Sequence, residues 1–192
     1  MSHEKVTSQD VVDAGLVCGT RSGESALAMG RFTMECVGAD GQVKWTATEH
    51  NLVVNTGLQY MAGSALTSVT QITTWFLGLY GAAASNTPAA SDTALSHIGW
   101  TEITPYSNGV RPTCSFATAT TANPSVATNA ASVATFNINA PAVVGGAFLI
   151  SSDVKGGTGG TLFSAADFQS PGDRTVVSGD TLNITYTLSL AG

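Results

Sequence analysis

The last apolar segment of the chain constrains its fold more than any other feature. From Leu182 to Leu190, apolar side chains at every second position alternate with neutral polar ones. The apolar set is Leu182, Ile184, Tyr186, Leu188 and Leu190, and the polar set is Asn183, Thr185, Thr187 and Ser189. A period of two places successive side chains on opposite faces of a β-strand. The segment therefore predicts a strand with one apolar face and one neutral, polar face.

Two further pairs of segments predict β-hairpins. Residues 31–37 and 43–48 each alternate apolar and polar side chains, and Ala39-Asp40-Gly41 lies between them. Residues 101–106 and 110–115 flank Ser107-Asn108-Gly109, where Asn-Gly supplies the positive φ angles of a tight turn. Residues 75–80 are continuously apolar, which indicates a buried strand, and residues 133–140 and 147–151 also favour strands.

Helices have a minor part in this pattern. Residues 51–66 favour a helix capped by Asn55 or Thr56, with Leu58, Met61, Ala62 and Ala65 on its apolar stripe. A second short helix is expected at residues 91–98, and long loops at residues 81–90, 117–131 and 153–160. The expected fold is mainly β, a β-sandwich or jelly-roll-like domain with one or two short helices.

The N-terminal part of the chain differs from the rest. Residues 1–28 carry mixed charge and little periodicity beyond Val11, Val12 and Leu16. A segment that buries little apolar surface of its own tends to order against a partner. We therefore interpret residues 1–28 as an arm, and residues 29–192 as one β-rich structural and interaction domain.

Charged side chains are scarce. They make up 10% of the chain, against about 25% in an average soluble domain. Between His50 and Ser152 the charged residues are Asp92, Glu102 and Arg111. The outer surface of this part must be largely neutral, which suits a protein whose faces are covered by other subunits. The alternative is an ordinary threonine-rich β-sandwich.

Charge and hydropathy argue against several classes of function. The net charge of −6 and scattered Lys and Arg residues do not favour nucleic-acid binding. We find no apolar run of about 20 residues for a membrane span, and the N-terminus lacks the features of a signal peptide. We therefore expect synthesis in the cytoplasm. Cys18, Cys36 and Cys114 lack the paired spacing of metal ligands and are expected to be reduced, structural thiols.

The residue types that carry chemistry do not form a known motif. His3, His50 and His97 are not at metal-ligand spacing, and no G-x-S-x-G nucleophile motif occurs. Lys155 precedes its glycines, whereas a phosphate-binding loop places Lys after them, so residues 156–160 are interpreted as a mobile connection. We predict no catalytic, cofactor-binding or metal-binding residue, and no enzyme.

Four acidic residues near the C-terminus leave an alternative open. They are expected in loops, where solvated turn residues are the simplest interpretation; a Ca²⁺ site or paired carboxylates for glycoside hydrolysis are the alternatives. The four are Asp153, Asp167, Asp173 and Asp180.

Four stretches together resemble small virion structural proteins of tailed phages, variously described as capsid decoration, cement or tail-associated proteins. The stretches are RFTMEC at 31–36 through GQVKW at 41–45 to NLVVNTGL at 51–58; WFLGLY at 75–80; SHIGWTE at 96–102 through Tyr106 to Arg111-Pro112; and SGDTL at 178–182. The resemblance covers roughly residues 30–190. It implies many copies on a symmetric shell or tail, with the arm free to reach a neighbouring subunit, and it transfers no functional residue.

We therefore expect a non-enzymatic decoration protein of the virion that binds the phage major coat protein and copies of itself, as a homo-oligomer. The alternative is a tail fibre, collar or receptor-binding module, in which the long loops form the recognition surface. A hydrolase acting on host glycan, with Asp167 or Asp180 as a required carboxylate, is a third hypothesis.

Overall fold

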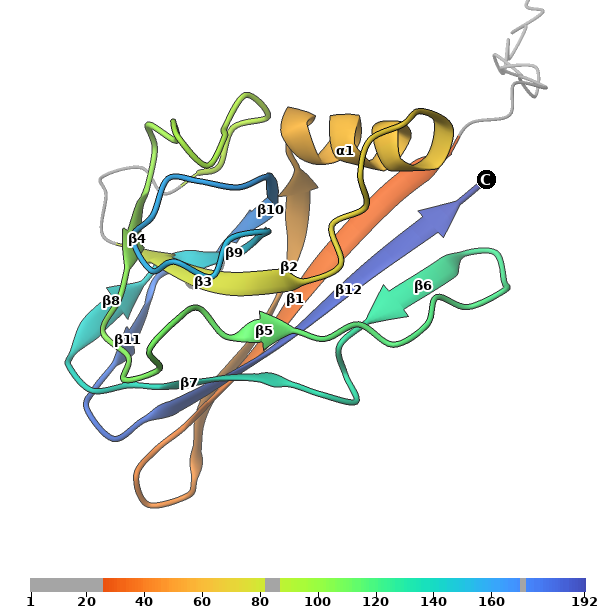
Figure 1. Ribbon diagram of the computed structural model, residues 1–192. Coiled ribbons are helices and arrows are strands. Elements are labelled where there is room, and N and C mark those ends of the chain that lie inside the picture. Colours follow the sequence, from red (N-terminus) through yellow and green to blue (C-terminus); the bar gives the residue numbers. More distant parts are fainter. Residues whose placement is uncertain (1–25, 82–86, 170–171) are drawn as a thin grey trace, which may run out of the picture.

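The computed structural model describes residues 26–81, 87–169 and 172–192 (Figure 1). These residues form one helix, α1 (Asn55–Leu66), and twelve strands. The strands are β1 (Leu27–Val37), β2 (Val43–Val53), β3 (Trp75–Gly81), β4 (Thr101–Ile103), β5 (Thr113–Cys114), β6 (Ser125–Thr128), β7 (Ala134–Asn137), β8 (Ala142–Val144), β9 (Gly146–Ile150), β10 (Leu162–Asp167), β11 (Arg174–Val176) and β12 (Thr181–Ala191).

Ten of these strands belong to one antiparallel sheet. Its order is β4-β3-β9-β10-β2-β1-β12-β6, with β5 paired to β3 and β7 paired to β12. Strands β8 and β11 form a separate two-stranded sheet. The prediction of a mainly β fold is confirmed. The finer prediction of a β-sandwich or jelly roll is not confirmed by these pairings.

Strands β1, β2 and β12 form the long, regular part of the sheet. The first predicted hairpin is confirmed, and its strands extend beyond the expected ranges. Gly41 in the turn of this hairpin has a backbone φ of 77°, which residues that carry a Cβ rarely adopt. Strand β12 pairs with β1 along its whole length, from Thr181 opposite Val37 to Ala191 opposite Leu27. The alternating pattern that predicts β12 places Leu182, Ile184 and Tyr186 in the core, whereas Leu188 and Leu190 on the same face are less buried.

Strand β2 connects the two parts of the sheet. Residues up to Asn51 pair with β1, and Leu52 and Val53 pair with β10. Asn51 lies opposite Gly30, and a Cβ on Gly30 would stand 2.0 Å from Asn51 Oδ1. The absence of a side chain at Gly30 thus lets Asn51 Nδ2 donate to the Tyr186 hydroxyl at 3.0 Å.

The core lies against the inner face of this sheet. Strand β3 is buried along almost its whole length, as its continuous apolar run predicts, and β9 beside it is fully buried. The strands expected at residues 133–140, 147–151 and 182–190 are present as β7, β9 and β12. Phe32 and Met34 of β1 meet Ile184 and Tyr186 of β12 in the same core.

Helix α1 differs from its prediction in start, cap and buried face. It begins at Asn55 because β2 continues to Val53, and no side chain caps it; Thr56 Oγ1 donates to the Leu162 carbonyl instead. Gly57 contacts the carbonyl of Phe163 so closely that a Cβ would stand 2.2 Å from its oxygen. This approach turns Gly57 toward β10. Three members of the expected stripe are exposed as a result: Leu58, Ala62 and Ala65.

The second predicted helix is wrong. Residues 91–98 form turns and bends. Asp92 Oδ2 accepts hydrogen bonds from the backbone N–H of Ala89 and from Trp100 Nε1, each at 2.9 Å. Thr93 Oγ1 accepts from the backbone N–H of Ser96 at 3.0 Å. Such local side-chain bonds offer the backbone an alternative to helix, which explains the difference.

The second predicted hairpin is also wrong. Strands β4 and β5 each pair with a different part of β3 and not with each other. Asn108, expected in the tight turn, binds β7 through its side chain: Nδ2 donates to Thr135 O, and Oδ1 accepts from Asn137 N, both at 3.0 Å. These contacts with β7 replace the tight turn that the sequence predicts at residues 107–109. Part of the long loop expected at 117–131 is strand β6, paired with β12.

Most of the predicted arm lies outside the described residues, as do Cys18 and His3. The structure begins at Ala26, and the last two arm residues, Leu27 and Ala28, belong to β1. The loop expected at 81–90 is described at Gly81 and from Thr87 onward. In residues 26–81, 87–169 and 172–192, no helix is long and apolar enough to cross a membrane.

Candidate functional site

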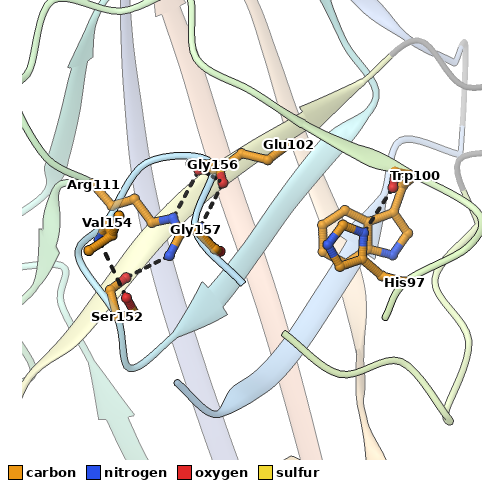
Figure 2. A network of polar contacts seen from close by, with 8 residues as sticks. All are labelled: His97, Trp100, Glu102, Arg111, Ser152, Val154, Gly156 and Gly157. Atoms are coloured by element: carbon orange, nitrogen blue, oxygen red, sulfur yellow. Dashed lines mark hydrogen bonds and ion pairs between the residues drawn. The ribbon is translucent and has the colours of Figure 1, made fainter. Parts of the chain in front are cut away.

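A buried ion pair lies where the connection after β4 meets the β9–β10 loop (Figure 2). Arg111 has 1% of its side chain exposed, and Glu102 has 8%. Arg111 Nε donates to Glu102 Oε1 at 2.9 Å, and Arg111 Nη2 donates to Glu102 Oε2 at 2.6 Å. This two-pronged geometry is the strongest form of arginine–carboxylate contact. The guanidinium carbon also lies 5.4 Å from the centre of the Phe148 ring.

The same two side chains bind the backbone of the glycine-rich loop. Arg111 Nη1 donates to Ser152 O at 2.8 Å, and Nη2 donates to Gly157 O at 3.0 Å. The backbone N–H of Gly156 donates to Glu102 Oε2 at 2.7 Å. The loop predicted to be a mobile connection is therefore held at several points by one buried ion pair.

Lys155 fixes the loop at a further point. Its Nζ donates to the carbonyls of Tyr106 and Asn108 at 2.7 and 3.0 Å and lies 4.0 Å from the centre of the Tyr106 ring. Burial, and next the charge of Glu102, raise the pKa of the Tyr106 hydroxyl above its ordinary value. The Lys155 ammonium group is thus engaged with protein carbonyls.

His97 and Trp100 lie at the other end of this region, as Figure 2 shows. Their rings stack at 3.9 Å, and His97 Nδ1 lies 2.9 Å from Trp100 O. Trp100 is 4% exposed and packs on Tyr80 and Phe148. A pocket of about 140 Å³ lies between His97, Trp100 and the ion pair. The arrangement can hold residues 97–102 against the β9–β10 loop, which is a positioning role.

The acidic residues proposed for a metal or hydrolytic site are not brought together as one group. Asp180 is 2% exposed, and its Oδ2 accepts from Lys44 Nζ at 2.7 Å and Val177 N at 2.9 Å. Burial opposes ionisation of Asp180, but these donors lower its pKa overall. The interpretation of Asp180 as a solvated turn residue is therefore wrong. Across the residues that the structure describes, no group of three His, Cys, Asp or Glu side chains could hold a metal ion.

Asp167 has the opposite electrostatic environment. Burial, followed by the charges of Asp173 and Glu49, raises the pKa of the Asp167 carboxyl, while a hydrogen bond from Gln169 Nε2 at 3.1 Å opposes the rise. Asp153 contributes its backbone carbonyl, which accepts from Arg111 N at 2.8 Å. Asp167 and Asp173 thus influence each other, whereas Asp153 and Asp180 have other partners, and His50 lies exposed on β2.

The cysteines described in the structure are buried, free thiols. Burial and the nearby Asp180 carboxylate raise the pKa of Cys36 to about 11, and burial raises the pKa of Cys114 to about 12. A nucleophilic cysteine needs a lowered pKa, because the thiolate is the reactive form. The structural role predicted for Cys36 and Cys114 agrees with these environments.

An apolar groove of about 600 Å³ lies between α1 and the end of β12. Among the residues that the structure describes, no charged side chain lines this groove. Its walls include Met61 and Ala65 of α1, Phe116, Ala127 of β6, and Leu188 and Leu190 of β12. This groove can receive an apolar side chain or segment, and it offers few hydrogen-bonding groups.

Sequence reasoning missed both regions, although each had a signal. Glu102 and Arg111 are isolated charges in a neutral stretch of sequence, and such a charge requires a partner when it is buried. Leu188 and Leu190 were assigned to the apolar face of a strand, but the groove leaves that part of the face uncovered.

Comparison of this chain with protein-family models, with curated proteins and with solved structures finds no match.

Proposed function

We propose that this chain is a non-enzymatic structural subunit of a tailed-phage virion, most specifically a capsid decoration protein that binds the major coat protein and stabilises the shell. The resemblance of residues 30–190 to small virion proteins supports the assignment to a virion. The low charge content supports a subunit whose faces are covered in an assembly.

One observation carries the proposal: among the described residues, the large apolar side chains with the highest exposure lie at the end of α1 and on the segment that begins beside this helix. Leu66 at the end of α1 is 85% exposed, and Leu95 and Ile98 are 77% and 94% exposed. The segment containing Leu95 and Ile98 begins beside the start of α1, where Asn55 N donates to Ala90 O at 2.8 Å. Leu66 lies at the opposite end of α1 from this contact, so we assign Leu95 and Ile98, which are three positions apart, to a protein-binding surface.

The outer face of strands β1, β2 and β12 is a second surface that neighbouring copies could contact on a shell. Thr33 of β1 lies between Thr48 of β2 and Thr185 of β12, and the charged residues of β1 on this face are Arg31 and Glu35, which have opposite signs. Neighbouring copies on a shell could approach it without desolvating many charges. Each contact would be modest, but binding on a lattice is multivalent, and avidity exceeds the affinity of a single contact by about 10²–10⁴.

The experiment measures binding of the purified chain to shells that lack it. We expect Leu95→Asp combined with Ile98→Asp to reduce occupancy at a fixed concentration at least about tenfold, because a carboxylate would be buried against an apolar partner. Val43→Asp is the matched control, since Val43 is 54% exposed in the hairpin far from α1 in Figure 1. Circular dichroism checks that all variants keep the fold.

Equal occupancy of wild-type and Leu95→Asp/Ile98→Asp protein would contradict the proposed binding surface. Copy number tests the location: hundreds of copies per particle support decoration, whereas a handful at one vertex would replace this proposal with a tail or collar module.

A further inference from the structure

We propose that residues 11–18 of this chain pack into the apolar groove between α1 and β12 of the same molecule. The inference is independent of the proposed function, because it concerns the chain alone.

The described residues leave the apolar lining of this groove partly uncovered. Strand β12 buries Leu182, Ile184 and Tyr186, but the same face continues with Leu188 and Leu190, which line the groove. A volume of about 600 Å³ is far larger than a packing defect and lies in the range of about 300–1,000 Å³ typical of binding pockets. The described part of the lining holds no charged side chain, so a charged occupant would lose hydration without an ionic partner there.

The described chain begins beside this groove. Leu27, the first residue of β1, pairs with Ala191, and Ala28 pairs with Leu190 of the groove wall. Figure 1 shows the start of β1 and the end of β12 near the C-terminal end of α1. Residues 1–25 precede this point, and the stretch from Cys18 to Ala26 spans about 26 Å when extended. Residues 11–18 can therefore reach the groove of their own molecule.

The composition of residues 11–18 matches the lining. The stretch is VVDAGLVC, in which Asp13 is the charged member and Val11, Val12, Leu16 and Val17 are aliphatic. Residues on either side of it are more polar: TSQD precedes it and GTRSGES follows it. The most apolar part of the N-terminal segment thus has the right distance from Ala26 and the right chemistry for the groove.

Covalent connection favours occupation within one molecule. A segment joined by a short linker has an effective concentration of about millimolar at its site. A segment from another molecule, or an unconnected peptide, must reach that concentration in solution to compete. We therefore assign the groove to the chain's own segment and not to that of a neighbour.

Cross-linking in the full chain tests this assignment, with native Cys18 as one partner. Leu190→Cys and Ser189→Cys place the second thiol at adjacent positions of β12 that face opposite sides of the sheet. Both positions lie beside the start of β1, because Leu190 pairs with Ala28 and Ser189 pairs with Met29. A short bis-maleimide should therefore link Cys18 within one molecule to Leu190→Cys on the order of tenfold more than to Ser189→Cys, because docking raises the local concentration on one face alone.

The remaining thiols should not interfere. Cys36 and Cys114 are buried, with pKa values of about 11 and 12, so little thiolate is present at neutral pH. Mass spectrometry identifies the linked peptides. Equal yields for the two variants would overturn the proposal, and so would links that join two molecules, which would assign the groove to a neighbouring copy.

A second measurement does not depend on the register of docking. Leu16→Asp in the full chain should open the groove and raise the fluorescence of a bound hydrophobic dye several-fold, because a carboxylate does not enter an uncharged groove. Ser22→Asp, in the same segment but outside residues 11–18, is the matched control and should leave the signal unchanged. Unchanged dye fluorescence in Leu16→Asp would overturn the proposal. Shell binding is measured separately, so either proposal can fail alone.

Discussion

The region around Arg111 and the groove beside α1 are built in opposite ways. In the first, charged groups reach across three segments, and hydrogen bonds of 2.6 to 3.0 Å link Arg111 and Glu102 to each other and to the glycine-rich loop. In the second, apolar side chains line an open volume of about 600 Å³. A buried ion pair requires its partners to be in place, whereas an apolar surface accepts many occupants.

The difference shows that this chain uses a buried ion pair to stabilise a loop and apolar surface to contact other segments. The ion pair fixes a loop that contains several glycines and has little apolar surface to bury. The groove and the exposed residues at the α1 end retain apolar surface for contact with other segments. Mutations should therefore have large effects on stability in the first region and small ones in the second.

The largest effect is expected from Arg111→Ala. Glu102 would remain buried without its partner, and the carbonyls of Ser152 and Gly157 would lose their donors. Breaking one side of a buried ion pair costs about 3–5 kcal/mol, so the free energy of unfolding should fall by roughly that amount. Urea denaturation followed by circular dichroism measures it.

Arg31→Ala is the control, because Arg31 lies on the exposed face of β1; it should change stability by less than about 0.5 kcal/mol. Arg111→Met combined with Glu102→Leu should recover part of the loss of Arg111→Met alone, since it leaves no unpaired charge. A loss below about 1 kcal/mol for Arg111→Ala would contradict the role assigned to the ion pair.

The second prediction compares the two parts of β12. Leu182 is fully buried, and Leu182→Ala should lower the free energy of unfolding by about 2–5 kcal/mol through lost contacts and a cavity. Leu190 is 39% exposed at the groove, and Leu190→Ala should cost less than about 1.5 kcal/mol. Both changes remove the same atoms from the same face of one strand, and urea denaturation compares them directly.

Equal losses for Leu182→Ala and Leu190→Ala would show that the groove is filled as tightly as the core. That result would be informative in the full chain, because tight packing of residues 11–18 on Leu190 would produce it. Leu16→Asp combined with Leu190→Ala separates the two explanations: non-additive losses indicate contact between the two positions.

Local pattern predicted those parts of the fold in which neighbours along the chain determine the structure. The alternation in β1, β2 and β12 reports which face is buried, and the structure agrees. It failed at residues 101–115, where Asn108 binds β7, and at α1, where Gly57 contacts β10. Both outcomes depend on segments that are distant in sequence, which a local pattern does not contain.

The same reason explains the sites. Glu102 and Arg111 are nine positions apart and meet the loop at residues 152–157, so their pairing requires the tertiary fold. The groove requires α1, β6 and β12 together. In contrast, the buried environment of Cys36 follows from its place in the alternation of β1, and sequence alone suggested its structural role.

The smallest effect concerns two carboxylates with opposite environments, Asp180 and Asp167. The pKa of Asp180 is lowered from its ordinary value of 3.8, so the native state holds it ionised at a pH where the unfolded chain binds a proton. Its stabilising contribution is present above pH 3.8 and is lost as the pH falls through the lower, native value. The pKa of Asp167 is raised from the same ordinary value, so the native state keeps a proton that the unfolded chain releases. Its contribution becomes unfavourable as the pH rises from 3.8 through the higher, native value.

Asp180→Asn should therefore destabilise the protein at pH 7, and Asp167→Asn should stabilise it modestly. Both differences from wild type should shrink as the pH falls to about 3, where the carboxyl groups are increasingly protonated in both states. Chemical denaturation at several pH values between about 3 and 7 measures the free energy of unfolding of each variant. Because Asn keeps the shape of Asp, a pH-independent difference would indicate altered packing and not charge. A contrary result would be a loss of stability of Asp167→Asn relative to wild type that grows as the pH rises. In that case the hydrogen bond from Gln169 would outweigh burial and the repulsion from Asp173 and Glu49, and the raised pKa assigned to Asp167 would be wrong.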